Sequence, residues 1–120
     1  MEAILIESTD ETPKIVCNIQ GKIEIIGKSL TEDPLAFYNP IHTWITNIDT
    51  ENIIMEMSLE YMNTASSKQI FTLIELAKKN KAKKQLTINW YYEANDEDTI
   101  DIGKEFESLL EIPFNFIIQS

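Results

Sequence analysis

Residues 53–79 of the chain read IIMEMSLEYMNTASSKQIFTLIELAKK, and this run predicts a strand, a short turn and a helix in direct succession. In its first part apolar and polar residues alternate, which is the period of a strand with one buried face. The buried set is expected to be Met55, Met57, Leu59 and Tyr61. In its second part apolar residues recur at offsets of three and four and therefore share one helical face. These residues are Ile70, Leu73, Ile74 and Ala77.

The turn between this strand and helix is rich in hydroxyl side chains. Its polar residues are Asn63, Thr64, Ser66 and Ser67. Either Asn63 or Thr64 is expected to cap the helix by accepting hydrogen bonds from its first amides, which stabilises a helix by about 1 kcal/mol. A second interpretation is that one hydroxyl carries a phosphate, which adds about −1.5 to −2 charges beside the positive end of the helix dipole. The two interpretations are compatible, because a capping hydroxyl is also an accessible one.

Five further segments have the composition of strands. They are residues 3–7, 15–18, 22–26, 85–92 and 114–118. The second and third flank Gln20-Gly21, which is a hairpin signal. The core-facing side chains of the fourth are expected to be Leu86, Ile88, Trp90 and Tyr92.

Two further helices are expected. The first begins at Asp33-Pro34, a favourable helix start. Its buried face is expected to contain Phe37, Ile41, Trp44, Ile45 and Ile48. Because Pro40 lacks an amide donor, we expect either a kink or a short turn followed by a helix that starts at Asn39-Pro40. The second helix has acidic residues at its positive N-terminal end and stops before Pro113. Its acidic residues are Asp96, Glu97 and Asp98, and its core face is expected to contain Ile102, Phe106, Leu109 and Leu110.

These elements predict an α/β fold with a single domain, residues 1–120, in which one mixed β-sheet carries a helical layer mainly on one face. A short strand–helix–strand unit forms a right-handed parallel crossover. The middle strands carry polar residues on one face, whereas strands covered on both faces read as continuous apolar runs. These polar residues are Glu56, Ser58, Glu60, Thr87 and Asn89. We therefore expect the second face of the sheet to be at least partly solvated.

Composition disfavours several classes of protein. The chain has 120 residues, enough for one core, and its formal net charge of −10 disfavours binding to nucleic acid or to an anionic membrane surface. Cys17 is the only cysteine, so no internal disulfide forms. The sequence has no signal-peptide pattern and no apolar run of the roughly 18–20 residues that span a membrane. The expected location is therefore the cytoplasm.

No arrangement of side chains predicts catalysis, and neither a cofactor nor a metal is expected. His42 is the only histidine and lies within a predicted helix, where packing is the usual role. Cys17 has no cationic neighbour in the sequence that would activate a thiolate. The three glycines form no phosphate-binding loop. The acidic residues 96–101 lack the calcium-loop pattern, because Ile100 stands where a ligand is required.

A series of residues in a fixed order resembles a known family. The series comprises Thr12-Pro13 with Ile15, then Gly21, Gly27-Lys28-Ser29, Phe37-Tyr38 with Pro40 and Trp44, then Tyr61, Asn63-Thr64 with Ser66-Ser67-Lys68, then Asn89-Trp90-Tyr91-Tyr92 before an acidic run, and Leu110 with Pro113-Phe114. This series covers most of the chain and is similar to the pattern of the SiaC-type regulatory phosphoproteins. The sequence departs from the family at Leu30-Thr31-Glu32-Asp33 and at Ala65, and both departures leave the phosphorylation site intact.

The resemblance implies a STAS-like fold, similar to the anti-sigma-factor antagonists, and a non-enzymatic switch protein phosphorylated on Thr64. Ser66 and Ser67 are the alternative acceptors. The implied partners are a serine/threonine kinase, a PP2C-type phosphatase and a diguanylate cyclase, so that the output is cyclic-di-GMP and biofilm formation. The docking surface is expected to include Asn63, Thr64, Ala65, Ser67 and Lys68.

The competing interpretation is a constitutive module that binds a small ligand or a peptide without phosphorylation. The ligand would lie on the solvated sheet face or in an apolar groove. Trp90, Tyr91 and Tyr92 at a strand end would supply aromatic contacts, although core packing is the more ordinary role of Trp90. A kinase and a PP2C phosphatase encoded beside this chain would favour the switch over the module.

Overall fold

The computed structural model describes residues 2–119, in which it has six strands and three helices. The strands are β1 (Ile4–Ile6), β2 (Lys14–Cys17), β3 (Lys22–Ser29), β4 (Asn52–Met62), β5 (Gln85–Glu93) and β6 (Phe114–Gln119). The helices are α1 (Pro34–Asn47), α2 (Thr64–Lys79) and α3 (Glu97–Leu110). Every element predicted from the sequence is present.

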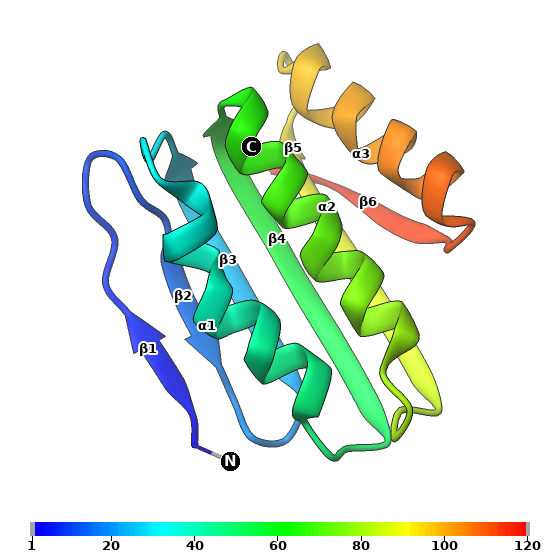
Figure 1. The fold of residues 1–120 in the computed structure, drawn as a ribbon. Helices are drawn as coiled ribbons and strands as arrows, with labels where there is room; N and C mark the ends of the chain where they lie inside the picture. The colour runs from blue at the N-terminus through cyan, green and yellow to red at the C-terminus, as the bar shows by residue number, and fades with distance from the viewer. Residues whose placement is uncertain (1, 120) are drawn as a thin grey trace.

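The strands form one sheet whose spatial order follows the chain, from β1 to β6. β1, β2 and β3 pair in antiparallel fashion, whereas β3, β4, β5 and β6 pair in parallel. One helix joins each parallel pair, and Figure 1 shows α1, α2 and α3 on the same side of the sheet. The predicted α/β fold, a mixed sheet with one helical layer, is confirmed.

The core lies between the three helices and the covered face of the sheet. Alternate residues of β4 point into it, and the side chains of Met55 and Met57 are 0% and 1% exposed. The apolar face of α2 packs against the same core, and its residues Ile70, Leu73, Ile74 and Ala77 are all buried. The predicted buried face of α2 is therefore confirmed.

Helix α1 begins at Pro34 and continues through Pro40, so the alternative of a helix that starts at Asn39-Pro40 is wrong. Asp33 caps the helix, since its side chain accepts the amide of Ala36 at 3.2 Å. Pro40 and Ala36 are both exposed, so water can replace the donor that the Ala36 carbonyl loses to the proline ring.

The predicted alternation of β4 holds as far as Leu59 and is wrong at Tyr61, whose side chain is 58% exposed. Between β3 and β4, Gly27 pairs with Leu59 whereas Lys28 pairs with Tyr61, so Glu60 is an extra residue in the ladder. A bulge of this kind shifts the alternation of the residues that follow it. Met62 takes the buried position instead, and Tyr61 is left at the surface.

The predicted core face of α3 is wrong at Leu109, whose side chain is 64% exposed. The buried residues of this helix are Thr99, Gly103, Phe106 and Leu110. A Cβ atom at Gly103 would lie 2.6 Å from Trp90 Nε1, so only glycine permits this approach to β5. Trp90 Nε1 also donates to the Thr99 carbonyl at 2.9 Å. These contacts set the rotation of α3 about its axis and turn Leu109 outward.

Candidate functional site

The turn between β4 and α2 lies at the carboxyl ends of the parallel strands. Ser29 at the end of β3 and Met62 at the end of β4 are register partners. All three helices begin at this end of the sheet (Figure 1). The turn therefore adjoins the connections that lead into α1 and α3.

Asn63 is the N-cap of α2. Its backbone is extended (φ −75°, ψ 169°), and its side-chain Oδ1 accepts the amide of Ser66 at 2.8 Å. Its carbonyl accepts the amide of Ser67 at 2.9 Å. Of the two capping residues considered from the sequence, Asn63 is the one used, so the Thr64 hydroxyl is not needed for capping.

The turn is anchored to β3 and to the start of α1. The Asn63 amide donates to the Ser29 carbonyl at 3.0 Å, and Asn63 Nδ2 donates to the Thr31 carbonyl at 3.4 Å. Beneath them, Ser29 Oγ and Tyr38 Oη share a hydrogen bond of 2.7 Å, and both residues are fully buried. Burial raises the pKa of Tyr38 to about 12, so its phenol stays neutral. The turn therefore rests on a packed and hydrogen-bonded base.

Thr64 is the first residue of α2 and is exposed. Within residues 2–119 no hydrogen bond engages its hydroxyl, and the amides of Thr64 and Ala65 have no acceptor inside the helix. Lys68 is exposed one turn later, at the i+4 spacing that pairs opposite charges on a helix. A phosphate on Thr64 would meet free amides, the positive end of the helix dipole and a lysine.

The other residues of the predicted site differ in their exposure. Ala65 is exposed, and Ser67 is half-buried with its Oγ donating to the Thr64 carbonyl at 2.9 Å. Ser66 is 0% exposed, and its Oγ has no hydrogen-bond partner within the described chain. A modifying enzyme cannot reach Ser66 in the folded protein, so Ser66 is withdrawn as an alternative acceptor.

An acidic hollow of about 360 Å³ lies beside the turn, between the end of β4 and the first turns of α3. Its lining includes Tyr61, Met62 and Ile102, together with the carboxylates of Glu60, Asp96, Asp98, Asp101 and Glu105. The alternation of β4 did not predict this surface, because it placed Tyr61 in the core. One side of the turn is consequently anionic.

His42, Cys17 and Asp96 make structural contacts within the fold. His42 Nε2 lies 2.9 Å from the Gln69 carbonyl and thereby links α1 to α2. Cys17 is 1% exposed, and burial raises the pKa of its thiol to about 12, so the reactive thiolate is scarce. Asp96 caps α3 by accepting the amide of Thr99 at 3.0 Å. Across residues 2–119 no cluster of three or more His, Cys, Asp or Glu is placed to hold a metal.

On the solvated face of the sheet, polar side chains form hydrogen bonds with one another. Glu56 accepts hydrogen bonds from Asn89 Nδ2 at 3.0 Å and from the Tyr91 hydroxyl at 2.7 Å. The hydrogen bond from the Tyr91 hydroxyl to Glu56 is the largest cause that raises the pKa of Tyr91, and desolvation and the negative charge of Glu56 add to it. Trp90 is 1% exposed and belongs to the core, while Tyr91 and Tyr92 are half-buried. Trp90 is thus unavailable to a ligand on this face.

The helices of residues 2–119 are all too short or too polar to cross a membrane.

Comparison with known proteins identifies the class. The model of the family described as "SiaC family regulatory phosphoprotein" matches residues 6–119, and the chain belongs to this family. An uncharacterized protein of Pseudomonas aeruginosa strain UCBPP-PA14 is 22% identical over 119 residues, which cover 95% of this chain and 94% of that protein.

Solved structures with the same fold come from the same organism. SiaC of Pseudomonas aeruginosa is 23% identical, with a TM-score of 0.80 over 99% of this chain and 98% of that chain. The crystal structure of the diguanylate cyclase SiaD in complex with its activator SiaC gives a TM-score of 0.84 at 21% identity, over 97% of this chain and 99% of that chain. At such identities the likeness establishes the fold, while the family match establishes membership of the SiaC family of regulatory proteins.

Proposed function

We propose that this chain is a non-enzymatic regulatory adaptor that is switched by reversible phosphorylation of Thr64. The main support is the division of roles in the turn. Asn63 caps α2, and the neighbouring hydroxyl of Thr64 is exposed and unoccupied within residues 2–119. Ser66 is buried and Ser67 is half-buried, so Thr64 is the acceptor with the best access. Membership of a family described as regulatory phosphoproteins supports phosphorylation as the role of this exposed hydroxyl.

Phosphorylation would change the charge of the docking surface without changing the fold. The unmodified turn presents the small neutral side chains of Asn63, Thr64 and Ala65. A phosphoryl group adds about −1.5 to −2 charges beside the acidic hollow. The first amides of α2 and Lys68 would hold that phosphate in place. A partner that packs against the neutral turn would have to desolvate the phosphate, which disfavours docking.

The proposal includes three partners. We propose a serine/threonine kinase and a PP2C-type phosphatase that modify Thr64 in the cytoplasm. We propose a diguanylate cyclase as the downstream partner, bound and activated by the unphosphorylated form. Support for the cyclase comes from SiaC of Pseudomonas aeruginosa, which shares this fold and is described as the activator of SiaD.

The switch is tested by titrating the cognate cyclase with wild type, Thr64→Ala and Thr64→Asp in a calorimeter. Wild type and Thr64→Ala should bind equally, because neither carries a charge in the turn. Thr64→Asp should bind at least about tenfold more weakly, or ~1.4 kcal/mol. Thr43→Asp, which adds the same charge at an exposed position of α1, is the matched control and should bind as wild type does. Equal binding by all four proteins would rule out a switch at Thr64.

The acceptor itself is identified by phosphopeptide mass spectrometry after co-expression with the kinase. Phosphate is expected on Thr64 and absent from Ser66. Phosphate on Ser67 alone, with Thr64 unmodified, would transfer the switch to a different hydroxyl and contradict the assignment.

A further inference from the structure

Half of the positive charges of this chain lie in one loop and in the end of the helix before it. All ten basic residues are lysines, and five of them lie within residues 78–84, at the end of α2 and in its connection to β5. The formal net charge is −10, so the loop is a positive region on an acidic molecule. It lies at the far end of α2 from Thr64, about 24 Å away at 1.5 Å per residue.

Two of these five lysines make polar contacts within the fold. Lys78 Nζ donates to the carbonyl of the last residue of α3 at 2.6 Å, and Lys84 Nζ pairs at 3.2 Å with a carboxylate in the loop before β4. Among the described residues, Lys79, Lys81 and Lys83 form no ion pair. Lys79 and Lys81 are exposed, so their charges are available to a partner.

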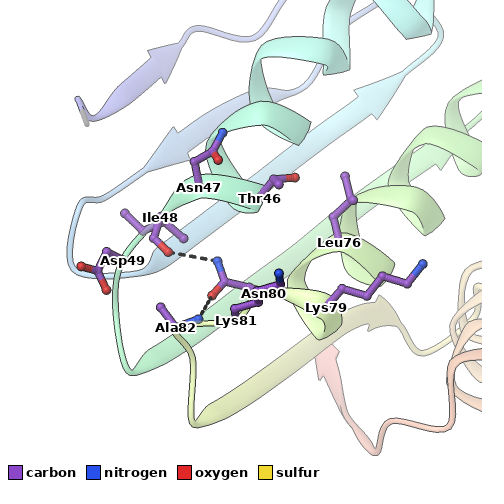
Figure 2. A pocket seen from close by; sticks show the side chains of 9 residues that line it. All are labelled: Thr46, Asn47, Ile48, Asp49, Leu76, Lys79, Asn80, Lys81 and Ala82. Atoms are coloured by element: carbon purple, nitrogen blue, oxygen red, sulfur yellow. Dashed lines mark hydrogen bonds between the residues drawn. The ribbon is translucent and has the colours of Figure 1, made fainter.

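Lys79 and Lys81 line a hollow of about 420 Å³ between the C-terminal ends of α1 and α2, drawn in Figure 2. Ile48 and Leu76 contribute apolar surface to the same hollow, and Asp49 is the single carboxylate in its lining. The hollow therefore combines apolar contact area with an excess of positive charge.

Asn80 connects the two sides of this hollow by hydrogen bonds. Its Nδ2 donates to the carbonyls of Ile45 and Ile48 at 2.9 and 3.0 Å, and its Oδ1 accepts the amides of Ala82 and Lys83 at 2.9 and 3.1 Å. Figure 2 shows the bonds to Ile48 and Ala82. Two carbonyls at the end of α1 that would repel an anion are thus already engaged. The loop is also preformed, so binding requires little ordering.

We propose that this hollow is a second docking surface, which binds an acidic segment of a partner protein. Carboxylates of the segment would pair with Lys79 and Lys81, and an apolar side chain would contact Leu76. The surface is distinct from the turn at Thr64 and does not depend on its phosphorylation. The chain would then hold two partners at the same time, one at each end of α2.

The charges of the lining favour an acidic protein segment as the occupant. Lysine ammonium groups are compact point charges, which suit the carboxylates of flexible side chains. Bidentate recognition of phosphate favours arginine, and the chain contains none. The net charge of −10 also repels an extended polyanion such as nucleic acid.

The surface is tested by an NMR titration of the full chain with a synthetic peptide of glutamate and leucine. Amide shifts should be confined to residues 46–49 and 76–84, and the peptide with glutamine in place of glutamate should give none. Affinity should fall when NaCl is raised from about 50 to about 300 mM, because salt screens exposed charges. The double variant Lys79→Glu/Lys81→Glu should bind at least about tenfold more weakly.

The matched control is Lys28→Glu/Lys104→Glu, which makes the same change of net charge at exposed positions of β3 and α3. It should bind the peptide within about twofold of wild type, because neither lysine lines the hollow and salt screens exposed charges at a distance. Equal losses in the two double variants, or shifts spread over all exposed lysines, would overturn the proposal. Tighter binding of a single-stranded DNA oligonucleotide at residues 76–84 would overturn it in favour of a nucleic-acid surface.

Discussion

Asn63 and Thr64 are neighbours with separate roles, and their separation can be measured. Asn63→Ala removes the acceptor of the Ser66 amide and the donor to the Thr31 carbonyl, so the free energy of unfolding should fall by about 1–2 kcal/mol. Thr64→Ala removes no hydrogen bond of the described chain, so it should change the free energy of unfolding by less than about 0.5 kcal/mol. Urea denaturation measures both values. The opposite order would mean that Thr64 caps the helix and that its hydroxyl is not free.

Gly103 is the residue that lets α3 approach β5. In Gly103→Ala the new Cβ would meet Trp90 Nε1 at 2.6 Å, so the helix or the indole must move. The expected loss of stability is about 1–3 kcal/mol, and the fluorescence of Trp90 should shift because its hydrogen bond to the Thr99 carbonyl is disturbed. Lys104→Ala, at the exposed next position, should stay within about 0.5 kcal/mol of wild type. Equal stability of the two variants would contradict the close contact.

Cys17 makes stability depend on pH in the alkaline range. Burial raises the pKa of its thiol from 9.0 to about 12. Between these values the unfolded chain loses the proton and the folded chain keeps it, so stability is full below pH 9 and declines above it. The decline is at most about 1.4 kcal/mol per pH unit from this group.

The comparison with Cys17→Ala isolates this effect. Urea denaturation at pH 8, 9 and 10 should show a smaller alkaline decline for the variant than for wild type. Tyr38, whose pKa burial raises from 10.0 to about 12, lowers stability only above about pH 10 and does so equally in both proteins. Parallel curves for the two proteins across this range would mean that the thiol is not buried.

At the scale of elements, the bulge at Glu60 determines the end of β4. Met62→Ala should destabilise the fold by about 2 kcal/mol or more, because Met62 is 7% exposed, whereas Tyr61→Ala should cost less than about 0.5 kcal/mol. Simple alternation predicts the reverse order. Thermal unfolding of both variants decides between them, with Leu59→Ala as the example of a buried residue before the bulge.

The same bulge shows why elements are easier to predict than the surfaces they form. The amphipathic period of α2 and the residue types at its start are local signals, and the structure confirms them. The register shift depends on which residues of β3 pair with β4, and those residues lie about thirty positions away in the chain. The exposure of Tyr61 and the acidic hollow follow from that pairing.

Across the whole molecule, protection against hydrogen exchange should follow the order of the strands. β1 has three residues at an edge of the sheet and pairs only with β2, whereas β4 pairs on both sides. Amides of Ile4–Ile6 should exchange at least about 100-fold faster than those at the centre of β4, because local opening releases an edge strand. Exchange followed by NMR measures the ratio.

The start of β1 has one further anchor, since Trp44 Nε1 donates to the Glu2 carbonyl at 2.8 Å. Trp44→Phe removes this bond and should speed hydrogen exchange in β1, while the ratio of the exchange rates of β3 and β4 should stay unchanged. Equal protection of β1 and β4 in the wild type would mean that the sheet opens only as a unit.

Residues close together in the chain determined the order of the elements, the one-sided sheet and the place of Thr64 at the start of α2. Periodicity and capping chemistry are local, so they can be read from the sequence alone. The tertiary structure decided which hydroxyl is exposed, that Tyr61 and Leu109 face outward, and that Lys79 and Lys81 line a preformed hollow. These features depend on contacts between distant segments: β3 with β4, Gly103 with Trp90, and the end of α1 with Asn80. No local pattern encodes such contacts, because each one exists only after the chain has packed.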